Sequence, residues 1–186
     1  MPCIGVLALQ GAFIKHCTHL ETLGIATKLV RTAQDLEGCE ALVIPGGEST
    51  TMLHHLSDSP LLASLKDFTT HHPVFGTCAG LILMSHHNIL DIEVERNAYG
   101  RQVHSFTDHL PVTLNGKSNS TKATFIRAPK ISRIGPSVEV ISTYEGEPVA
   151  VKQDHHMGLA FHPELDGVTL FHQFVFTTQF ESVHAA

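Results

Sequence analysis

The first half of the chain alternates short apolar runs with segments of helical periodicity. Four short runs are predicted to be strands, and the continuous apolar run at residues 4–9 is expected to be buried on both faces of a sheet. They cover residues 4–9, 26–30, 41–44 and 73–75. Between the runs, apolar residues recur at three- and four-residue spacing, which is typical of helices packed on a core. The helices predicted in this way cover residues 13–23, 49–56 and 60–70. This alternation favours a parallel sheet covered by helices on both faces.

The second half of the chain has a different pattern, in which short β-like runs are separated by turn residues. The predicted strands cover residues 92–95, 110–114, 123–126, 138–142, 149–153 and 158–161. The polar stretch 115–121 between two of them is predicted to be a loop. A closing helix is expected over residues 168–180. Because no internal repeat or linker divides the chain, we predict one α/β domain over residues 1–186, with a mixed-sheet extension.

Composition narrows the classes of protein that fit this pattern. Of the 186 residues, 42% are hydrophobic and 16% are charged, as in ordinary globular proteins. The net charge of −6 and the absence of a basic cluster argue against a nucleic-acid or membrane surface. The apolar N-terminal run is too short to span a bilayer and has no basic leader, so we expect a cytoplasmic protein.

Histidine and cysteine are the residues that could indicate metal or redox chemistry. The fifteen histidines are scattered and show no metal-ligand spacing, which favours solvated or loop histidines over a metal site. The four cysteines form no CxxC pair, and reduced thiols are the simplest interpretation. We therefore expect neither a metal nor a cofactor.

The strongest local motif is Gly76-Thr77-Cys78-Ala79-Gly80, between an apolar strand and a predicted helix. It has the form of a nucleophile elbow with cysteine at the reactive position, where glycines relieve the crowding of a sharp turn. A helix N-terminus at Cys78 favours the thiolate. A lone cysteine is more often a small buried side chain, but the glycines and the strand-turn-helix context favour a nucleophile.

A thiol nucleophile needs a base, and Phe161-His162-Pro163-Glu164 contains a candidate base and a group to orient it. Pro163 favours an extended His162, and residues i and i+2 of an extended segment project to the same side. Glu164 is then predicted to bond one imidazole nitrogen while the other faces Cys78. Taken alone, the motif also fits a surface loop.

The Gly-rich turn Pro45-Gly46-Gly47 ends a predicted strand and leads into a helix whose cap is predicted to be Ser49. Exposed N–H groups at such a turn could bind an anion or an oxyanion. The turn lacks the lysine and the spacing of a P-loop.

Together, these and other motifs resemble one family, the glutaminase subunits of pyridoxal 5′-phosphate synthase, within the class I glutamine amidotransferases. The matching segments span nearly the whole chain and cover residues 5–11, 45–52, 76–80, 94–97, 100–102, 125–129 and 161–164. Leu-Gln-Gly at residues 9–11 and the Arg-Asn…Gly-Arg-Gln block at 96–102 distinguish this family from other class I amidotransferases.

The resemblance implies a three-layer α/β/α sandwich with a mostly parallel, flavodoxin-like central sheet. It implies that glutamine is hydrolysed by a triad of Cys78, His162 and Glu164. Glutamine-binding positions fall on Gly47, Glu48, Ser49, Arg96, Ile126 and Arg127. Oxyanion or partner-coupling roles fall on Gly46, Gly47, Ala79 and Gln10. The ammonia would pass to a synthase subunit that builds pyridoxal phosphate, which is a product of the complex and not a cofactor of this chain.

Two other interpretations stay open from the residues. A stand-alone γ-glutamyl hydrolase or peptidase of the same fold would use the same thioester chemistry on a larger substrate. A redox module with Cys78 as a sensor thiol would not need Glu164 two residues after His162. Arg96 and Arg127 could also be structural or face a partner, although a planar guanidinium suits the carboxylate of glutamine.

Overall fold

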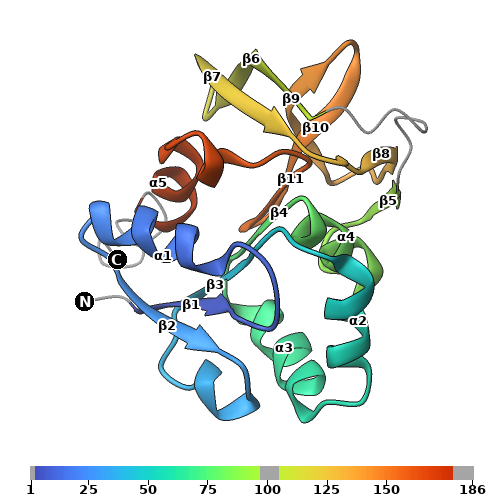
Figure 1. Cartoon of the computed structure of the whole chain (residues 1–186). Coiled ribbons are helices and arrows are strands. Elements are labelled where there is room, and N and C mark those ends of the chain that lie inside the picture. Colours follow the sequence, from blue (N-terminus) through green and yellow to red (C-terminus); the bar gives the residue numbers. More distant parts are fainter. Residues whose placement is uncertain (1–2, 97–104, 178–186) are drawn as a thin grey trace.

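A seven-stranded sheet forms the centre of the computed structural model, which describes residues 3–96 and 105–177 (Figure 1). The strand order is β2-β1-β3-β4-β11-β10-β9. The first five strands are parallel, and β10 and β9 continue the sheet in antiparallel pairing. Their bounds are β1 (Cys3–Leu7), β2 (Ala26–Val30), β3 (Ala41–Ile44), β4 (Val74–Thr77), β9 (Glu139–Tyr144), β10 (Glu147–Gln153) and β11 (His156–Leu159).

Helices cover both faces of this sheet. One face carries α1 (Phe13–Thr22) and α5 (Leu170–Phe176), and the other carries α2 (Ser49–Ser57), α3 (Pro60–His71) and α4 (Ala79–His86). Successive residues of β4 show the two sides: the Phe75 ring contacts His172 and Phe176 of α5, whereas Gly76 faces Met84 of α4. The predicted three-layer sandwich with a flavodoxin-like strand order is therefore confirmed.

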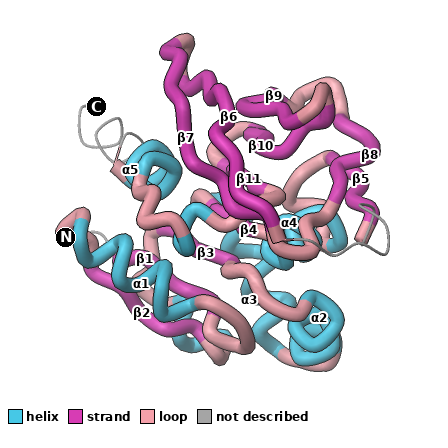
Figure 2. The backbone as a smooth tube through the Cα atoms, turned by 45° about the horizontal axis from the view of Figure 1, so that its top comes forward, coloured by secondary structure: helices cyan, strands magenta, loops and turns pink. Residues whose placement is uncertain are grey.

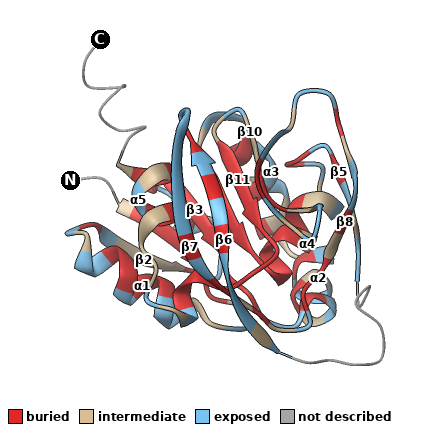
Figure 3. Cartoon of the chain, turned by 90° about the horizontal axis from the view of Figure 1, so that it is seen from above, coloured by how far each residue is buried: buried red, intermediate tan, exposed pale blue. Residues whose placement is uncertain are grey.

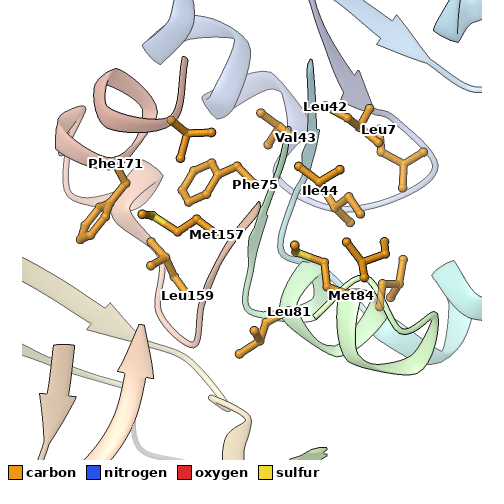
Figure 4. Close-up of a cluster of buried hydrophobic side chains, with 14 of the residues drawn as sticks. Leu7, Leu42, Val43, Ile44, Phe75, Leu81, Met84, Met157, Leu159 and Phe171 are labelled. Carbon is orange, nitrogen blue, oxygen red and sulfur yellow. The ribbon is translucent and has the colours of Figure 1, made fainter. Parts of the chain in front are cut away.

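Continuous apolar strands form the core, as the sequence pattern predicts. Every residue of β3 and β4 is buried, because both faces of these central strands lie under helices (Figure 3). Figure 4 shows side chains of the parallel strands β1, β3, β4 and β11 meeting helical side chains on both sides of the sheet. The labelled core residues include Leu7, Val43, Phe75, Leu81, Leu159 and Phe171.

The segment between α4 and β9 adds two small antiparallel sheets. β5 (Ile92–Glu95) pairs with β8 (Lys130–Ile134), and β6 (Phe106–Leu114) pairs with β7 (Lys117–Phe125) as a hairpin beside β9 (Figure 2). The prediction of a loop over 115–121 is wrong, because only Asn115 and Gly116 form the turn and β7 begins at Lys117. The polar residues of this stretch lie in the exposed part of the β6–β7 hairpin, where strand residues that face water can be polar. The strand β8 was not predicted.

Two predictions extend past the described residues. The closing helix is confirmed over 170–176, whereas its predicted end at 178–180 lies outside them. The motif residues 97 and 100–102 also lie outside. No helix in the described ranges is long and apolar enough to cross a membrane.

Candidate functional site

A cleft of about 610 Å³ lies where several parallel strands end, and it gathers most of the predicted site residues. Its lining consists of Ala12, Gly46, Gly47, Glu48, Ser49, Cys78, Ala79, Ile82, Arg96, Ile126, Arg127, His162 and Leu165. The strand order reverses between β1 and β3, and the segments that follow these strands meet here. Open α/β sheets bind ligands at such a switch point.

Cys78 occupies the sharp turn between β4 and α4. Its φ of 48° and ψ of −102° are strained for a residue with a side chain, and such strain gathers at functional sites. The Cys78 N–H donates to the carbonyl oxygen of Leu159 at 2.8 Å, which ties the turn to β11. A Cβ atom on Gly80 would overlap the carbonyl oxygen of Ile44, so the elbow packs closely enough to require glycine there.

His162 and Glu164 are hydrogen-bonded and buried beside Cys78. The distance between His162 Nδ1 and Glu164 Oε1 is 2.6 Å, and both residues are buried. The extended-segment geometry predicted for this pair is wrong for Glu164, which lies in the 3-10 helix η2 (Pro163–Leu165). The tight turn after His162 folds the carboxylate back onto the imidazole, so the predicted contact forms by another route.

The surroundings of His162 favour its protonated form. Burial lowers its pKa, but hydrogen bonds with Cys78 and Glu164 and their charges outweigh burial and raise this pKa to about 10. Such a pairing suits a cysteine that reacts as a thiolate next to an imidazolium.

Strand β7 holds the His162–Glu164 segment in place. The His162 N–H donates to the carbonyl oxygen of Thr124 at 2.9 Å. The Asp166 carboxylate accepts a hydrogen bond from Thr124 Oγ1 and pairs with Lys122 Nζ, each at 3.0 Å. The small hairpin therefore supports the site as well as covering it.

The glycine turn after β3 is held from both sides. The Gly46 carbonyl oxygen accepts from Ala12 N–H at 3.0 Å, and its N–H donates to Thr77 Oγ1 at 3.1 Å. A Cβ atom on Gly46 would overlap the His162 ring, and one on Gly47 would overlap Gln10 Oε1. Gln10 lies behind the turn, where its Oε1 accepts from Glu48 N–H at 2.6 Å.

Glu48, and not Ser49, caps α2, so the predicted cap is off by one residue. The Glu48 carboxylate accepts from Thr50 N–H at 3.1 Å and from Thr51 N–H at 2.8 Å. Hydrogen bonds from the Thr51 hydroxyl and from both N–H groups lower the pKa of Glu48 to about 2. The longer side chain reaches back over the first turn, which leaves Ser49 as the first helical residue. Arg96 Nη2 lies 3.9 Å from this carboxylate and donates to Thr50 Oγ1.

Ile126 and Arg127 follow β7 and reach the cleft from the opposite side. The Ile126 carbonyl oxygen lies 3.7 Å from Cys78 Sγ. Arg127 has a φ of 45° and an exposed side chain, so it is a second strained residue with a side chain at the cleft.

The structure thus places all the predicted site residues at the cleft except Gln10 and Glu164, which lie behind its wall. Sequence reasoning missed the lining residues Ala12, Ile82 and Leu165. It also missed Thr77 and His16, which contact the site from within the core. Thr77 lies inside the elbow motif, but its hydroxyl bond joins segments 31 residues apart, which no local pattern indicates.

The described residues hold no group of three or more His, Cys, Asp and Glu side chains arranged to bind a metal ion. All four cysteines, at positions 3, 17, 39 and 78, are free.

Comparison with known proteins identifies relatives over nearly the full chain. The model of the SNO glutamine amidotransferase family matches residues 6–182. The pyridoxal 5′-phosphate synthase subunit PdxT of Francisella philomiragia is 44% identical over 175 residues, covering 92% of this chain and 96% of that protein. The PdxT subunit of Oenococcus oeni is 45% identical over 180 residues, covering 92% of this chain and 93% of that protein.

Solved structures agree with this relationship. A crystal structure of a glutamine amidotransferase is 38% identical and superimposes with a TM-score of 0.86, covering 94% of this chain and 97% of that one. PurLQS from Thermotoga maritima, at 15% identity and a TM-score of 0.81, shares the fold. Because the family model spans most of the chain and the relatives match it closely, the chain belongs to the SNO glutamine amidotransferase family.

Proposed function

We propose that this protein hydrolyses L-glutamine to L-glutamate and ammonia through Cys78, His162 and Glu164, and that the ammonia serves pyridoxal 5′-phosphate synthesis. The observation that carries the proposal is the contact of Cys78 with His162, which is in turn bonded to Glu164, at the wall of one cleft. Family membership supplies the substrate class.

In the reaction, the Cys78 thiolate attacks the side-chain amide carbon of glutamine. The C–N bond of the tetrahedral intermediate then breaks, His162 gives its proton to the leaving nitrogen, and a glutamyl thioester and ammonia form. His162 next takes a proton from water, whose oxygen attacks the thioester and releases glutamate and the thiol. Glu164 keeps the imidazole oriented through both steps.

Backbone N–H groups near Cys78 would stabilise the oxyanion of each tetrahedral intermediate. Gly47 and Ala79 line the cleft, and among the described residues no hydrogen bond takes up their N–H groups. The Gly46 N–H is already donated to Thr77, so Gly46 acts as a spacer that makes room for His162. Gly47 and Ala79 are therefore the better candidates for an oxyanion hole.

The glutamine backbone would lie at the outer part of the cleft. Arg96 and Arg127 can pair with its carboxylate, and the Glu48–Ser49 backbone and Ile126 form the adjoining walls. The Glu48 carboxylate is occupied with capping α2, so this residue contributes mainly through its main chain.

The partner in this proposal is the synthase subunit of pyridoxal 5′-phosphate synthase, because the PdxT relatives carry the name of a subunit of that enzyme. Gln10 bonds the loop that forms one wall of the cleft, so contact with a partner near Gln10 could change the loop's N–H orientation. We infer that the synthase raises the glutaminase rate by completing the oxyanion hole, on the scale of about 10²–10³-fold for one donor.

An ammonia-release assay on the purified full chain, with and without the synthase subunit, tests the proposal. Cys78→Ala should abolish ammonia release from glutamine, while Cys3→Ala, which replaces a half-buried cysteine outside the cleft, should retain it. Retained activity in Cys78→Ala would refute the nucleophile. An equal wild-type rate with and without the synthase would refute the partner coupling alone.

A further inference from the structure

A cluster of buried histidines lies directly behind the proposed triad. His16 of α1 and His172 of α5 have no exposed surface, and His19 is 9% exposed. The distance between His16 Nδ1 and His172 Nε2 is 2.8 Å. On its other side, His16 Nε2 lies 3.7 Å from Glu164 Oε2 and 3.3 Å from Thr77 Oγ1.

Glu164 has one carboxylate oxygen that the triad does not use. Its Oε1 is bonded to His162, whereas its buried Oε2 accepts no hydrogen bond from the described residues. A buried carboxylate oxygen without a donor is costly, so a nearby group able to donate stabilises the ionised form. His16 Nε2 is the ring nitrogen placed closest to that role.

The surroundings of His16 favour its neutral form. Burial lowers its pKa well below the usual value, and the neighbouring His172, His19 and His162 lower it further. The apolar edge of Phe75 also packs against this ring, with the ring centroids 6.3 Å apart. A neutral imidazole carries one N–H, on either Nδ1 or Nε2. The nitrogen that holds the proton decides whether Glu164 Oε2 faces an N–H or a lone pair of His16.

Two tautomers are compatible with the His16–His172 bond. If His16 carries its proton on Nδ1, it donates to His172, a lone pair faces Glu164 Oε2, and the His172 Nδ1–H has no acceptor. If His16 carries its proton on Nε2, the N–H points at Glu164 Oε2 and Thr77, and His172 Nε2–H donates to Nδ1. In this second form the unpartnered His172 Nδ1 is a lone pair, so neither histidine keeps a buried N–H without an acceptor, and an N–H instead of a lone pair faces the Glu164 carboxylate.

We propose that His16 is a positioning residue of the catalytic site, with its Nε2–H directed at the free oxygen of Glu164 and His172 fixing that tautomer. The residue acts at a distance from glutamine, since it does not line the cleft. It holds the Glu164 carboxylate in position, and Glu164 in turn orients His162. His16 Nε2 also lies near Thr77 Oγ1, which accepts the Gly46 N–H independently of His16.

The inference rests on the proposed triad, and a double-mutant cycle in the full chain, assayed with the synthase subunit present, separates the two. His16→Phe keeps a ring of similar size but removes the donor. It should lower kcat about 10-fold, with KM for glutamine unchanged, because a ring N–H 3.7 Å from the carboxylate acts on it electrostatically and more weakly than a full hydrogen bond. His16→Gln, whose amide can place an N–H near the position of Nε2, should restore part of the rate.

Coupling to Glu164 is the decisive measurement. In a Glu164→Gln background there is no carboxylate to stabilise, so adding His16→Phe should cause little further loss of kcat. The positioning role would be overturned if the fold-loss of kcat in the double variant equalled the product of the two single fold-losses. An unchanged kcat in His16→Phe would overturn it as well. Should His16→Phe fail to fold, His172→Phe, which leaves the Glu164 contact in place but frees the tautomer, must still lower kcat without changing KM. If Glu164→Gln alone has wild-type activity, the triad fails instead of the inference about His16.

Discussion

At the scale of single residues, the proposed triad of Cys78, His162 and Glu164 owes its geometry to a few close contacts. Cys78 has a φ that only a sharp turn imposes, and His162 fits beside it because Gly46 has no side chain. Glu164 is buried and bonded to His162 at 2.6 Å. Each of these positions is fixed by backbone as well as by side-chain packing, so substitutions within the triad should change chemistry more than structure.

The roles of His162 and Glu164 are predicted to differ in magnitude. His162→Asn removes the base and the proton donor to the leaving nitrogen, so kcat should fall by several orders of magnitude. Glu164→Gln keeps the side-chain shape but removes the charge that stabilises the imidazolium, and a smaller loss is expected. Single-turnover and steady-state glutaminase rates in the presence of the synthase measure both. Near wild-type rates in the two variants would contradict the triad.

At the scale of elements, the start of α2 connects stability with the site. Glu48 caps this helix through two N–H groups and the Thr51 hydroxyl, and the residues just before it form the cleft wall. Loss of the cap should loosen the first turn and with it the Gly46–Gly47 turn.

Glu48→Ala is therefore expected to speed amide exchange at Thr50 and Thr51 and to raise KM for glutamine. Hydrogen exchange followed by NMR, together with steady-state kinetics, measures both effects. Ser59→Ala provides the matched control, because Ser59 caps α3 through Leu61 N–H and lies outside the cleft lining. It should change exchange locally and leave KM as it is. Slow exchange and wild-type KM in Glu48→Ala would mean that the cap and the site are independent.

The same cap predicts a pH dependence. The folded-state pKa of Glu48 is lowered from 4.5 to about 2, so the stabilisation is present above 4.5 and is lost as the pH falls towards 2. The difference in melting temperature between the wild type and Glu48→Gln should shrink across this window. A difference that stays constant from pH 5 to pH 2 would contradict the role of the charge.

At the scale of the whole molecule, buried histidines should make the protein sensitive to mild acid. Burial lowers the pKa of His172 to about 3 and that of His156 to about 4, and burial also lowers those of His16 and His19. Unfolded imidazoles bind protons below pH 6.5, whereas these folded ones do not until lower pH. Acidification from pH 6.5 to 5 therefore favours the unfolded state.

Urea unfolding at several pH values tests this dependence. Each fully buried neutral histidine contributes a slope of about 1.4 kcal/mol per pH unit in this range. In His172→Phe, the dependence of the free energy of unfolding on pH should be weaker than in the wild type by about the contribution of one histidine. This holds whatever the stability of the variant at pH 7. His54→Gln, at an exposed position of α2, is the control and should keep the wild-type slope. His162 adds little to the slope below pH 6, because its raised pKa keeps it protonated in the folded protein and the unfolded imidazole is mostly protonated there too. A pH-independent stability would contradict the prediction.

Local patterns predicted the elements that are buried on both faces and the residues that sit at strand ends. The run at 41–44 matches the fully buried β3, the run at 26–30 matches the bounds of the partly exposed edge strand β2, and the Cys78 elbow lies where its glycines indicated. The hairpin β6–β7 was harder to predict because half of its surface faces water, which makes a polar strand resemble a loop. His16 and Thr77 contact site residues that are distant in the sequence, so these contacts could be identified only from the tertiary structure.

The two strands that flank the central segment of the chain have a consequence for how such proteins can diversify. Cys78 follows β4 and His162 follows β11, and these neighbouring strands are joined in register, with Gly76 opposite Gly158. The intervening segment, residues 87–155, carries Arg96, Ile126 and Arg127, which form the outer wall of the cleft. The spacing between the proposed nucleophile and the proposed base is set by this pair of strands, so loops of the intervening segment can change without altering it, provided that β7 still accepts the His162 N–H through Thr124. The proposed chemistry thus depends mainly on one pair of neighbouring strands, whereas one wall of the cleft can be remodelled through the segment inserted between them.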